Sequence, residues 1–316
     1  MDRFLKIAFV GVGSIAKRHI RNLKEILEER KYKYSIDVIR SGKGGVLDED
    51  LVEIIHRVLS EADQVEADYD IFFITNPTSL HYDAIKKYVG CTKHMFIEKP
   101  VFDSLDYDVD RIGLNKNNIY YVACPLRYTA ALQYVFEKID YKSAICIRSI
   151  CSSYLPNWRP NVDYRKTYSA HKDMGGGVSI DLVHEWDYLV AMYGYPQKVK
   201  SVITKKSSLE IDSDDIALYI GEYENQIIEL HLDYFGYKSV REMQLFMPDD
   251  VITVDIQNNI ITFEKSGRKI ILHEERDEYQ KRELIYFLDM IEGKEENTNT
   301  IEQAMKVLRI AKGEWK

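Results

Sequence analysis

The sequence lacks the features that would indicate a membrane, nucleic-acid-binding or metal-binding protein. No apolar run in its 316 residues approaches the length of a membrane span. Its formal net charge of −8 does not suggest a nucleic-acid or anionic-membrane partner. The cysteines show no CxxC pair and no Cys/His metal spacing, so we expect no metal and interpret them as reduced thiols of a cytoplasmic protein. They are Cys91, Cys124, Cys146 and Cys151.

The chain also has no internal repeat and no low-complexity linker. Its length is enough for two domains of ordinary size, and 45% hydrophobic with 30% charged residues is a balance typical of soluble globular proteins. The apolar N-terminal stretch could be mistaken for a signal segment. Because Lys6 interrupts it, a first strand explains it better.

Residues 1–123 alternate between apolar strands and helical patterns. Residues 6–10 form a β-type run, apolar residues then recur at helical spacing from Ile15 to Leu27, and residues 70–75 resemble a strand buried on both faces of a parallel sheet. The sequence predicts further strands at 35–40, 93–97 and 119–123, and helices at 49–59 and after Asn76. This alternation predicts an α/β domain, a doubly wound parallel sheet, over residues 1–123.

The pattern changes after Cys124, where a helix at 126–139 precedes runs with alternating apolar and polar residues. The runs cover 143–149, 199–204, 216–223, 226–234, 242–247, 251–256, 260–264 and 269–273, and helices at 276–292 and 301–312 close the chain. We therefore predict an α+β domain over residues 124–316, with a large, mostly antiparallel sheet that has helices on one face. We expect that the last helix can pack back on the first domain.

A glycine turn, Gly11-Val12-Gly13-Ser14-Ile15-Ala16, joins the first strand to the first helix. In that context GxGxxG/A indicates dinucleotide binding in a Rossmann domain. Gly11 permits the tight turn, Gly13 lets a pyrophosphate approach the backbone, and Ala16 allows close packing of helix and strand. The free N–H groups at the helix start then face the phosphates. The alternative is a glycine turn that merely connects a strand to a helix.

The end of the second predicted strand carries Arg40, Ser41 and Lys43 but no carboxylate. Because this set suits a ribose 2′-phosphate, we expect NADP(H) to be preferred, with NAD(H) as the alternative. Asp37 lies near the distance at which an NAD-binding protein places an acid, but it sits in mid-strand. A basic solvated loop is the plainer interpretation.

Another polar group, Glu98-Lys99-Pro100, ends the predicted strand at 93–97. Proline disfavours a helical conformation at the preceding residue, so Lys99 is held extended at the sheet edge, where a cis Lys99–Pro100 bond is conceivable. The alternative for an isolated Lys-Pro is a solvated lysine in a turn.

In the second domain, Gly175-Gly176-Gly177 leads into a predicted helix that presents Asp181 and His184 on one face. A carboxylate can orient a neighbouring imidazole, whose ordinary pKa lies near neutrality. On general grounds an acid near a helix start and a hydrogen-bonded histidine are the commoner interpretation.

The segment from Tyr154 to Tyr168 interleaves aromatic rings with arginines, which suits a sugar ring with an anionic group. The alternative is a loop that only covers the sheet.

Taken together, GVGSIA, Asn76-Pro77 with His81, Glu98-Lys99-Pro100, Arg127-Tyr128 and GGGVSIDLVHEWD resemble the glucose–fructose oxidoreductase / inositol dehydrogenase / rhizopine-catabolism family of NAD(P)-dependent oxidoreductases. The resemblance covers nearly the whole chain. It implies a Rossmann domain followed by a substrate-binding and oligomerisation domain, with Lys99, Asp181 and His184 as the catalytic residues. Many members have four residues from the aspartate to the histidine, whereas here there are three, so we place a one-residue deletion between Asp181 and His184.

The resemblance also implies binding residues. Cofactor contacts are expected at Gly11, Gly13, Ser14, Ile15, Ala16, Arg40, Ser41, Thr75, Asn76, Pro77, His81, Glu98 and Lys99. Substrate contacts are expected at Arg127, Trp158, Arg159, Tyr164, Arg165, Tyr168, Asp181 and His184.

The activity expected from this resemblance is hydride transfer between nicotinamide and a secondary alcohol or ketone of a sugar, sugar acid or nucleotide-sugar. His184 would act as the general acid/base, Lys99 would stabilise the developing alkoxide, and Asp181 would orient His184 or bind a neighbouring hydroxyl. The alternative is a non-catalytic NAD(P)-binding sugar sensor on the same scaffold. The expected partners are a small sugar-type substrate and further copies of the chain, in a dimer or tetramer.

Overall fold

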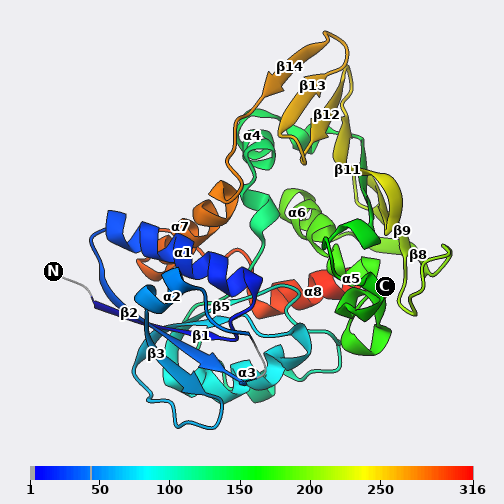
Figure 1. Cartoon of the computed structure of the whole chain (residues 1–316). Coiled ribbons are helices and arrows are strands. Elements are labelled where there is room, and N and C mark those ends of the chain that lie inside the picture. The colour runs from blue at the N-terminus through cyan, green and yellow to red at the C-terminus, as the bar shows by residue number, and fades with distance from the viewer. Residues whose placement is uncertain (1–3, 43–44, 316) are drawn as a thin grey trace. The chain divides into compact units, whose positions relative to one another are not determined.

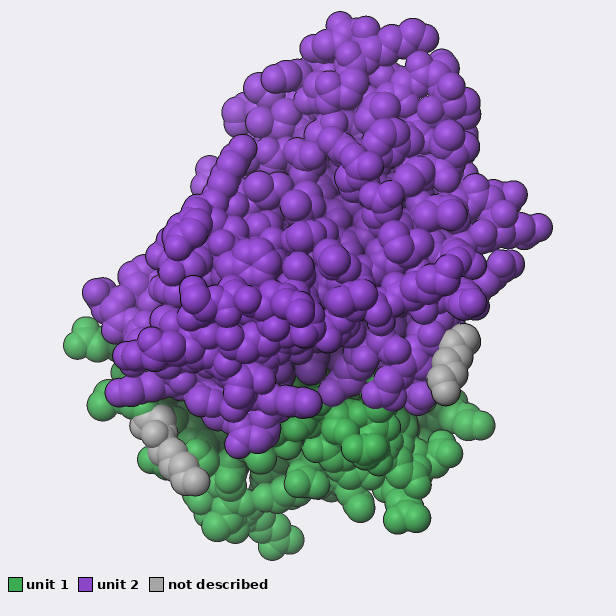
Figure 2. Space-filling view, turned by 90° about the vertical axis from the view of Figure 1, so that its right-hand side faces the viewer, with its two compact units in different colours: residues 1–123, 280–305 green, residues 124–279, 306–316 purple. Residues whose placement is uncertain are grey.

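A computed structural model describes residues 4–42 and 45–315. The chain divides into two compact units, which Figure 2 shows in different colours. Unit 1 consists of residues 1–123 and 280–305, and unit 2 consists of residues 124–279 and 306–316. Within the described part of the chain, no helix combines the length and the apolar character needed to cross a membrane.

Unit 1 is built on a six-stranded parallel sheet in the order β3-β2-β1-β4-β5-β6 (Figure 1). Its strands are β1 (Phe4–Val10), β2 (Lys33–Arg40), β3 (Ile55–Ser60), β4 (Tyr69–Ile74), β5 (Thr92–Ile97) and β6 (Tyr120–Val122). The three central strands are almost entirely buried, and the rings of Phe9, Phe73 and Phe96 stack across them at 4.3 and 5.1 Å. This strand order confirms the predicted doubly wound Rossmann sheet.

The helices of unit 1 are α1 (Ser14–Glu29), α2 (Glu49–Ile54), α3 (His81–Tyr88) and nearly all of α7 (Glu278–Ile291). Arg18 of α1 contacts Gln280 near the start of α7, and Arg30, directly after α1, contacts Glu292, directly after α7. Helix α7 therefore lies along α1 (Figure 1). Beyond α7 the chain returns to the edge of the sheet, where the amide of Asn299 donates to the carbonyl of Val122 at 2.9 Å.

The predicted helix at 49–59 is wrong beyond Ile54, because residues 55–60 form the edge strand β3. Exposure alternates along β3, and Arg57 faces inward to pair with the buried Asp37 of β2 at 2.8 Å. Pairing with β2 and this ion pair outweigh the helical pattern of a short segment.

Unit 2 is built on an eight-stranded sheet in the order β14-β13-β12-β11-β7-β10-β9-β8. The strands are β7 (Cys146–Tyr154), β8 (Lys198–Thr204), β9 (Ile216–Glu222), β10 (Ile227–Asp233), β11 (Phe235–Phe246), β12 (Val251–Asp255), β13 (Ile260–Phe263) and β14 (Arg268–Ile271). The β7–β10 pair is parallel and the other pairs are antiparallel, which confirms the predicted second sheet.

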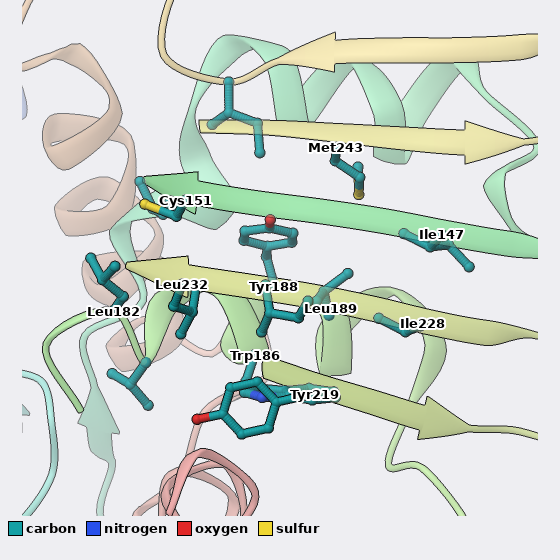
Figure 3. Packing of buried hydrophobic residues seen from close by; sticks show 14 of the residues in the cluster. Ile147, Cys151, Leu182, Trp186, Tyr188, Leu189, Tyr219, Ile228, Leu232 and Met243 are labelled. Atoms are coloured by element: carbon teal, nitrogen blue, oxygen red, sulfur yellow. The ribbon is translucent and has the colours of Figure 1, made fainter. Parts of the chain in front are cut away.

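Helices α4 (Ala130–Lys138), α5 (Val178–Asp181), α6 (His184–Tyr193) and the second half of α8 (Ile301–Ala311) complete unit 2. Trp186, Tyr188 and Leu189 of α6 pack against the strands in one apolar cluster (Figure 3). Full burial of side chains of this size contributes about 1.5–3 kcal/mol each, so α6 is firmly seated on the sheet.

The helix predicted at 126–139 begins only at Ala130. A 3-10 turn over Pro125–Tyr128 precedes it, and Thr129 caps the helix by accepting a hydrogen bond from the backbone N–H of Leu132. A capping threonine favours an extended backbone before the first helical residue, so it separates the turn from the helix.

Candidate active site

The turn between β1 and α1 has the geometry of a phosphate-binding loop. Gly11 adopts a φ of +84°, and a Cβ there would lie 2.8 Å from Cα of Asn76. Gly13 is the N-cap of α1, and nothing lies within 4 Å of the place where its Cβ would be. No side chain caps α1 and its first turn contains no acid. The helix N-terminus can therefore receive the pyrophosphate of a dinucleotide.

The segment after β4 closes on this turn. The hydroxyl of Thr75 donates to the carbonyl of Gly11 at 2.8 Å. The buried ring of His81 lies between two carbonyl oxygens, that of Asn76 at 3.0 Å and that of Val101 at 3.1 Å. Burial lowers the pKa of His81 below its usual value. His81 therefore joins the Asn76–Pro77 loop to the segment that follows Lys99.

Glu98, the residue before Lys99, is held through both its backbone and its side chain. Its backbone N–H donates to Ile74, and its Oε1 lies 2.6 Å from Nε2 of His19 on α1. Burial would raise the pKa of Glu98, but the His19 hydrogen bond and the charges of Lys99 and His81 hold that pKa below its usual value. An ionised Glu98 thus fixes the strand end that carries Lys99.

Lys99 is half-buried, and the Lys99–Pro100 peptide bond is cis, as the sequence suggested. The role of His19 went unpredicted, although a signal existed, since a polar side chain on the apolar stripe of α1 needs a buried partner.

At the end of β2 the described carboxylate nearest in sequence, that of Asp37, is already engaged. It is buried and accepts hydrogen bonds from Arg57 and from the hydroxyl of Tyr69, the latter at 2.6 Å. Arg40 ends the strand and donates to the carbonyl of Gly45, and Ser41 follows on the exposed surface. Lys43, which the sequence grouped with them, lies outside the described residues.

In unit 2 the single helix predicted through Asp181 and His184 is wrong. Asp181 ends α5 and His184 begins α6, because Leu182 leaves helical geometry at φ −99° and ψ 26°. Leu182 and Val183 are both buried in this break, so packing rather than helix propensity decides the local backbone.

Asp181 and His184 differ in their exposure to solvent. In the fully described run 176–190 every residue other than His184 is buried. The carboxylate of Asp181 is 5% exposed and accepts a 2.6 Å hydrogen bond from the hydroxyl of Tyr234. The arrangement combines a fixed buried carboxylate with a solvent-accessible imidazole three residues later, at the start of a helix.

The glycine loop before α5 is held by Asp214, which the sequence analysis missed. Its Oδ2 accepts a 2.9 Å hydrogen bond from the backbone N–H of Ser179, and its carbonyl accepts one from Val178. Gly177 has a φ of +134°, and a Cβ there would lie 2.3 Å from Oδ1 of Asp214. Burial raises the pKa of Asp214. Gly177 therefore makes room for this carboxylate.

Two of the three arginines predicted to contact substrate have protein partners. Arg127 forms a bidentate ion pair with Asp187 of α6, with N–O distances of 2.7 and 2.8 Å. Arg165 pairs with Asp163 at 2.9 Å and with Glu210 at 3.0 Å. Arg127 is thus tied to α6, and Arg165 ties its own loop to the segment between β8 and β9, so both guanidinium groups already have carboxylate partners.

The third arginine, Arg159, lies over the ring of Tyr168 at 5.6 Å, and both side chains are exposed. Burial of its hydroxyl end and the charge of Asp181 raise the pKa of Tyr168 above its usual range. Trp158 packs edge-on against Tyr234 at 5.2 Å. Thus Trp158 and Asp181 share Tyr234 as a neighbour.

Tyr164 accepts a 3.2 Å hydrogen bond from the backbone N–H of Glu210. It therefore joins the predicted substrate loop to the loop between β8 and β9.

A sequence model described as "Oxidoreductase family, NAD-binding Rossmann fold" matches residues 5–110. The chain is similar to an uncharacterised oxidoreductase, YrbE, of Bacillus subtilis, with 24% identity over 99% of this chain and 94% of that protein. It is also similar to a D-xylose dehydrogenase of Paenarthrobacter nicotinovorans, with 27% identity over 44% of this chain and 37% of the relative.

Two solved structures share the fold over nearly the full length. A UDP-N-acetylglucosamine 3-dehydrogenase, GnnA, of Acidithiobacillus ferrooxidans superposes with a TM-score of 0.77 at 18% identity, over 98% of this chain and 96% of that one. A levoglucosan dehydrogenase in complex with NADH and levoglucosan gives 0.79 at 15% identity, over 98% and 96%. At these identities the likeness shows the fold.

Proposed function

Because residues 5–110 match a model of an oxidoreductase family with an NAD-binding Rossmann fold, and an uncharacterised oxidoreductase is similar over 99% of this chain, we propose that the chain is a member of the glucose–fructose oxidoreductase / inositol dehydrogenase / rhizopine-catabolism family and that it transfers a hydride between a nicotinamide cofactor and a sugar. The reacting group is a secondary alcohol or ketone of a sugar, sugar acid or nucleotide-sugar. When bound, the cofactor supplies the hydride chemistry itself. The chain supplies binding, orientation and proton transfer.

The observation that carries the proposal is the accessibility of His184 in an otherwise buried run. An imidazole that only stabilised the core would be buried with its neighbours. His184 is instead partly exposed, and its helix α6 is fixed by the buried Trp186 and Leu189. A fixed backbone and an accessible ring are what a general acid/base needs.

We assign three catalytic residues. His184 takes or gives the hydroxyl proton of the substrate as the hydride moves. Lys99 donates a charge-assisted hydrogen bond that stabilises the developing alkoxide. Asp181, held by Tyr234, orients His184 or accepts a hydrogen bond from a neighbouring substrate hydroxyl.

The dinucleotide would lie with its pyrophosphate at the start of α1, where Gly13 leaves open space. NADP(H) is the preferred form in this proposal. The support is that Arg40 and Ser41 end β2, while Asp37 is buried and already bonded to Arg57. A guanidinium at the strand end can pair with a 2′-phosphate. The ribose of NAD(H), in contrast, would find no carboxylate there to accept hydrogen bonds from its hydroxyl groups.

The proposed substrate class is supported by the aromatic residues of unit 2 and by the names of the similar proteins. The relatives and solved neighbours include dehydrogenases of D-xylose, levoglucosan and a UDP-amino sugar. In this chain, Trp158 and Tyr168 offer flat faces for a sugar ring, and Arg159 offers a cation.

The direct test is an absorbance assay of NADPH and NADH with the purified chain and a panel of polyols, uronic acids, nucleotide-sugars and their keto forms. Oxidation or reduction of the cofactor by at least one sugar, abolished in His184→Ala, is the expected result. A cofactor that binds, with its fluorescence changed, but never changes redox state with any of the panel would favour the sensor instead.

A further inference from the structure

We propose that unit 2 carries a second binding site, for a small ring compound with an anionic group, in the groove between the loop after β8 and the start of β11. The groove has a volume of about 390 Å³. It is lined by Tyr154, Lys206, Ser207, Ser208, Leu209, Phe235 and Tyr237. Tyr154 is the first residue of the segment that the sequence predicted to suit a sugar ring, and the other lining residues are not among those assigned above to the candidate active site. The volume falls in the range of about 300–1,000 Å³ that is usual for small-molecule sites.

One wall of the groove is a β-bulge in β11. Phe235 pairs with Tyr154 and Val240 with Ser152, so five steps along β11 match only two along β7. The buried carboxylate of Asp233 holds the bulge by accepting hydrogen bonds from the backbone N–H groups of Phe235, at 3.0 Å, and Gly236, at 2.8 Å.

Gly236 lets the bulge approach its neighbour closely, since a Cβ there would lie 1.9 Å from Oγ of Ser152. The bulge carries Tyr237 out to 83% exposure, where its ring lies 4.5 Å from that of Tyr154. A tyrosine so exposed contributes little to stability, yet the backbone beneath it is held by the buried Asp233, whose other carboxylate oxygen contacts His231 at 2.8 Å. This combination indicates a surface kept in shape for a ligand.

The opposite wall is held in the same way by a second buried acid. The carboxylate of Asp215 is 0% exposed and accepts from the backbone N–H of Lys206 at 2.7 Å and of Ser207 at 2.9 Å. It also accepts from the hydroxyl of Ser207 at 2.6 Å. Two buried aspartates, Asp233 and Asp215, thus fix both walls of one groove.

The lining determines the chemistry of the ligand. Three aromatic rings offer flat apolar faces to a ring, and Ser207 and Ser208 offer hydroxyls. Lys206 is exposed, and among the described residues its ammonium group has no hydrogen bond or ion pair, while no described residue that lines the groove is acidic. In a chain with a net charge of −8, a groove with a cation and no acid selects an anion. A sugar carrying a carboxylate or a phosphate fits this lining.

The experiment measures binding rather than turnover, so its outcome is independent of the proposed oxidoreductase activity. Calorimetric titrations of the full chain would use D-glucuronate as the carboxylate probe, glucose 6-phosphate as the phosphate probe and glucose as the neutral one. The variants are Lys206→Ala and Tyr237→Ala, and Lys269→Ala, an exposed lysine of β14, is the matched control. Each variant must keep the wild-type melting temperature, which exposed positions allow.

We expect at least one anionic probe to bind with a Kd below about 1 mM, and each groove substitution to weaken it about tenfold or more, as the loss of a charge-assisted contact implies. Lys269→Ala should bind as the wild type does. The proposal is overturned if glucose binds as tightly as the anionic probes, if both groove variants bind them unchanged, or if no probe binds. Loss of self-association in Tyr237→Ala without probe binding would show that a second copy covers the groove, and would also overturn it.

Discussion

The hydroxyl of Tyr234 donates a 2.6 Å hydrogen bond to Oδ2 of Asp181, and both side chains are buried. Tyr234 follows directly after β10, so the carboxylate is tied to the sheet as well as to the end of α5. This hydrogen bond helps to set the position of the Asp181 carboxylate.

Replacing Tyr234 with phenylalanine tests the importance of its hydrogen bond to Asp181. The variant Tyr234→Phe leaves one oxygen of a buried carboxylate without its donor, and hydrogen bonds to charged groups contribute about 1.5–3 kcal/mol. We expect kcat to fall about tenfold or more, with a smaller change in KM, in the sugar assay. The matched control is Tyr219→Phe, which removes a buried hydroxyl bonded to the carbonyl of Ala311. Equal losses of kcat in both variants would contradict a role through Asp181.

Lys99 and His184 are predicted to be catalytic. Lys99→Ala and His184→Ala should each lower turnover by about 10²-fold or more, the usual scale of acid–base contributions, while the melting temperature changes little. The reason is that both side chains are partly exposed and neither forms part of an apolar core.

Matched controls for these two substitutions are Lys93→Ala, at the exposed start of β5, and His273→Ala, on the surface of unit 2. Both controls should retain activity. Full activity in Lys99→Ala or His184→Ala, or unfolding of either, would show the assignment to be wrong.

Cofactor choice is predicted to depend on Arg40. A charge-assisted pair with the 2′-phosphate is worth roughly 1.5–3 kcal/mol, so NADPH should bind about tenfold or more tighter than NADH. Fluorescence titration of Arg40→Ala should show weaker binding of NADPH and little change for NADH. Arg111→Ala, whose guanidinium pairs with Asp108 at the surface, is the control. Tighter binding of NADH than of NADPH by the wild type would reverse the proposal.

The Asp37–Arg57 pair predicts how stability depends on pH. Burial would raise the pKa of Asp37, but hydrogen bonds from Arg57, Tyr69 and His56 hold it below its usual value of 3.8. A carboxyl with a lowered folded-state pKa stabilises the fold above the unfolded pKa, and that contribution is lost as the pH falls through the folded one. Asp37→Asn should therefore lower the free energy of unfolding by about 1–3 kcal/mol at pH 7.

The difference between Asp37→Asn and wild type should shrink as the pH falls below about 4, where the carboxyl of the unfolded chain begins to protonate while that of the folded chain is still ionised. Urea unfolding at pH 7, 5, 4 and 3 measures it. A difference that stayed constant over that range would mean that the aspartate is not ionised in the fold.

The open face of the second sheet predicts self-association. Val202 and Leu218 lie opposite each other on β8 and β9, exposed by 58% and 37%, and Ile220 and Ile227 extend the apolar surface at 40% and 45%. An apolar face of this kind commonly pairs with a copy of itself, so sedimentation should show a dimer or tetramer at micromolar concentration. Ile220→Lys should shift the chain toward monomer. A monomeric wild type would remove the claim.

The sequence predicted the elements that local pattern determines. Strand, glycine turn and helix around Gly11 and Gly13, and the alternation in residues 226–234, were sufficient for the two sheets, because both patterns are carried by adjacent residues. Residues 55–60 could not be assigned this way. Their strand depends on pairing with β2 and on the partner that Arg57 finds in Asp37, twenty residues earlier.

The same holds at the candidate site. The residue types around Asp181 and His184 could be read from the motif, but the break at Leu182 is produced by burial against the sheet. Asp214 holds the glycine loop from 35 residues away, and no periodicity in the sequence points to such a contact. Contacts between distant segments decide these features, and a single sequence does not display them.

The return of the chain to β6 has a consequence for synthesis on the ribosome. Phe287 packs against Phe96 and Tyr121, and Asn297 and Asn299 bond to the edge strand, although residues 124–279 separate them from it. Domains tend to fold as units while the chain emerges N-terminus first. Here the sheet of unit 1 is translated first but is completed last. Its edge and part of its aromatic core stay uncovered until about the last tenth of the polypeptide has left the exit tunnel. A nascent chain stalled before residue 280 should therefore expose that edge to chaperones, even though nearly all of unit 2 has already been made.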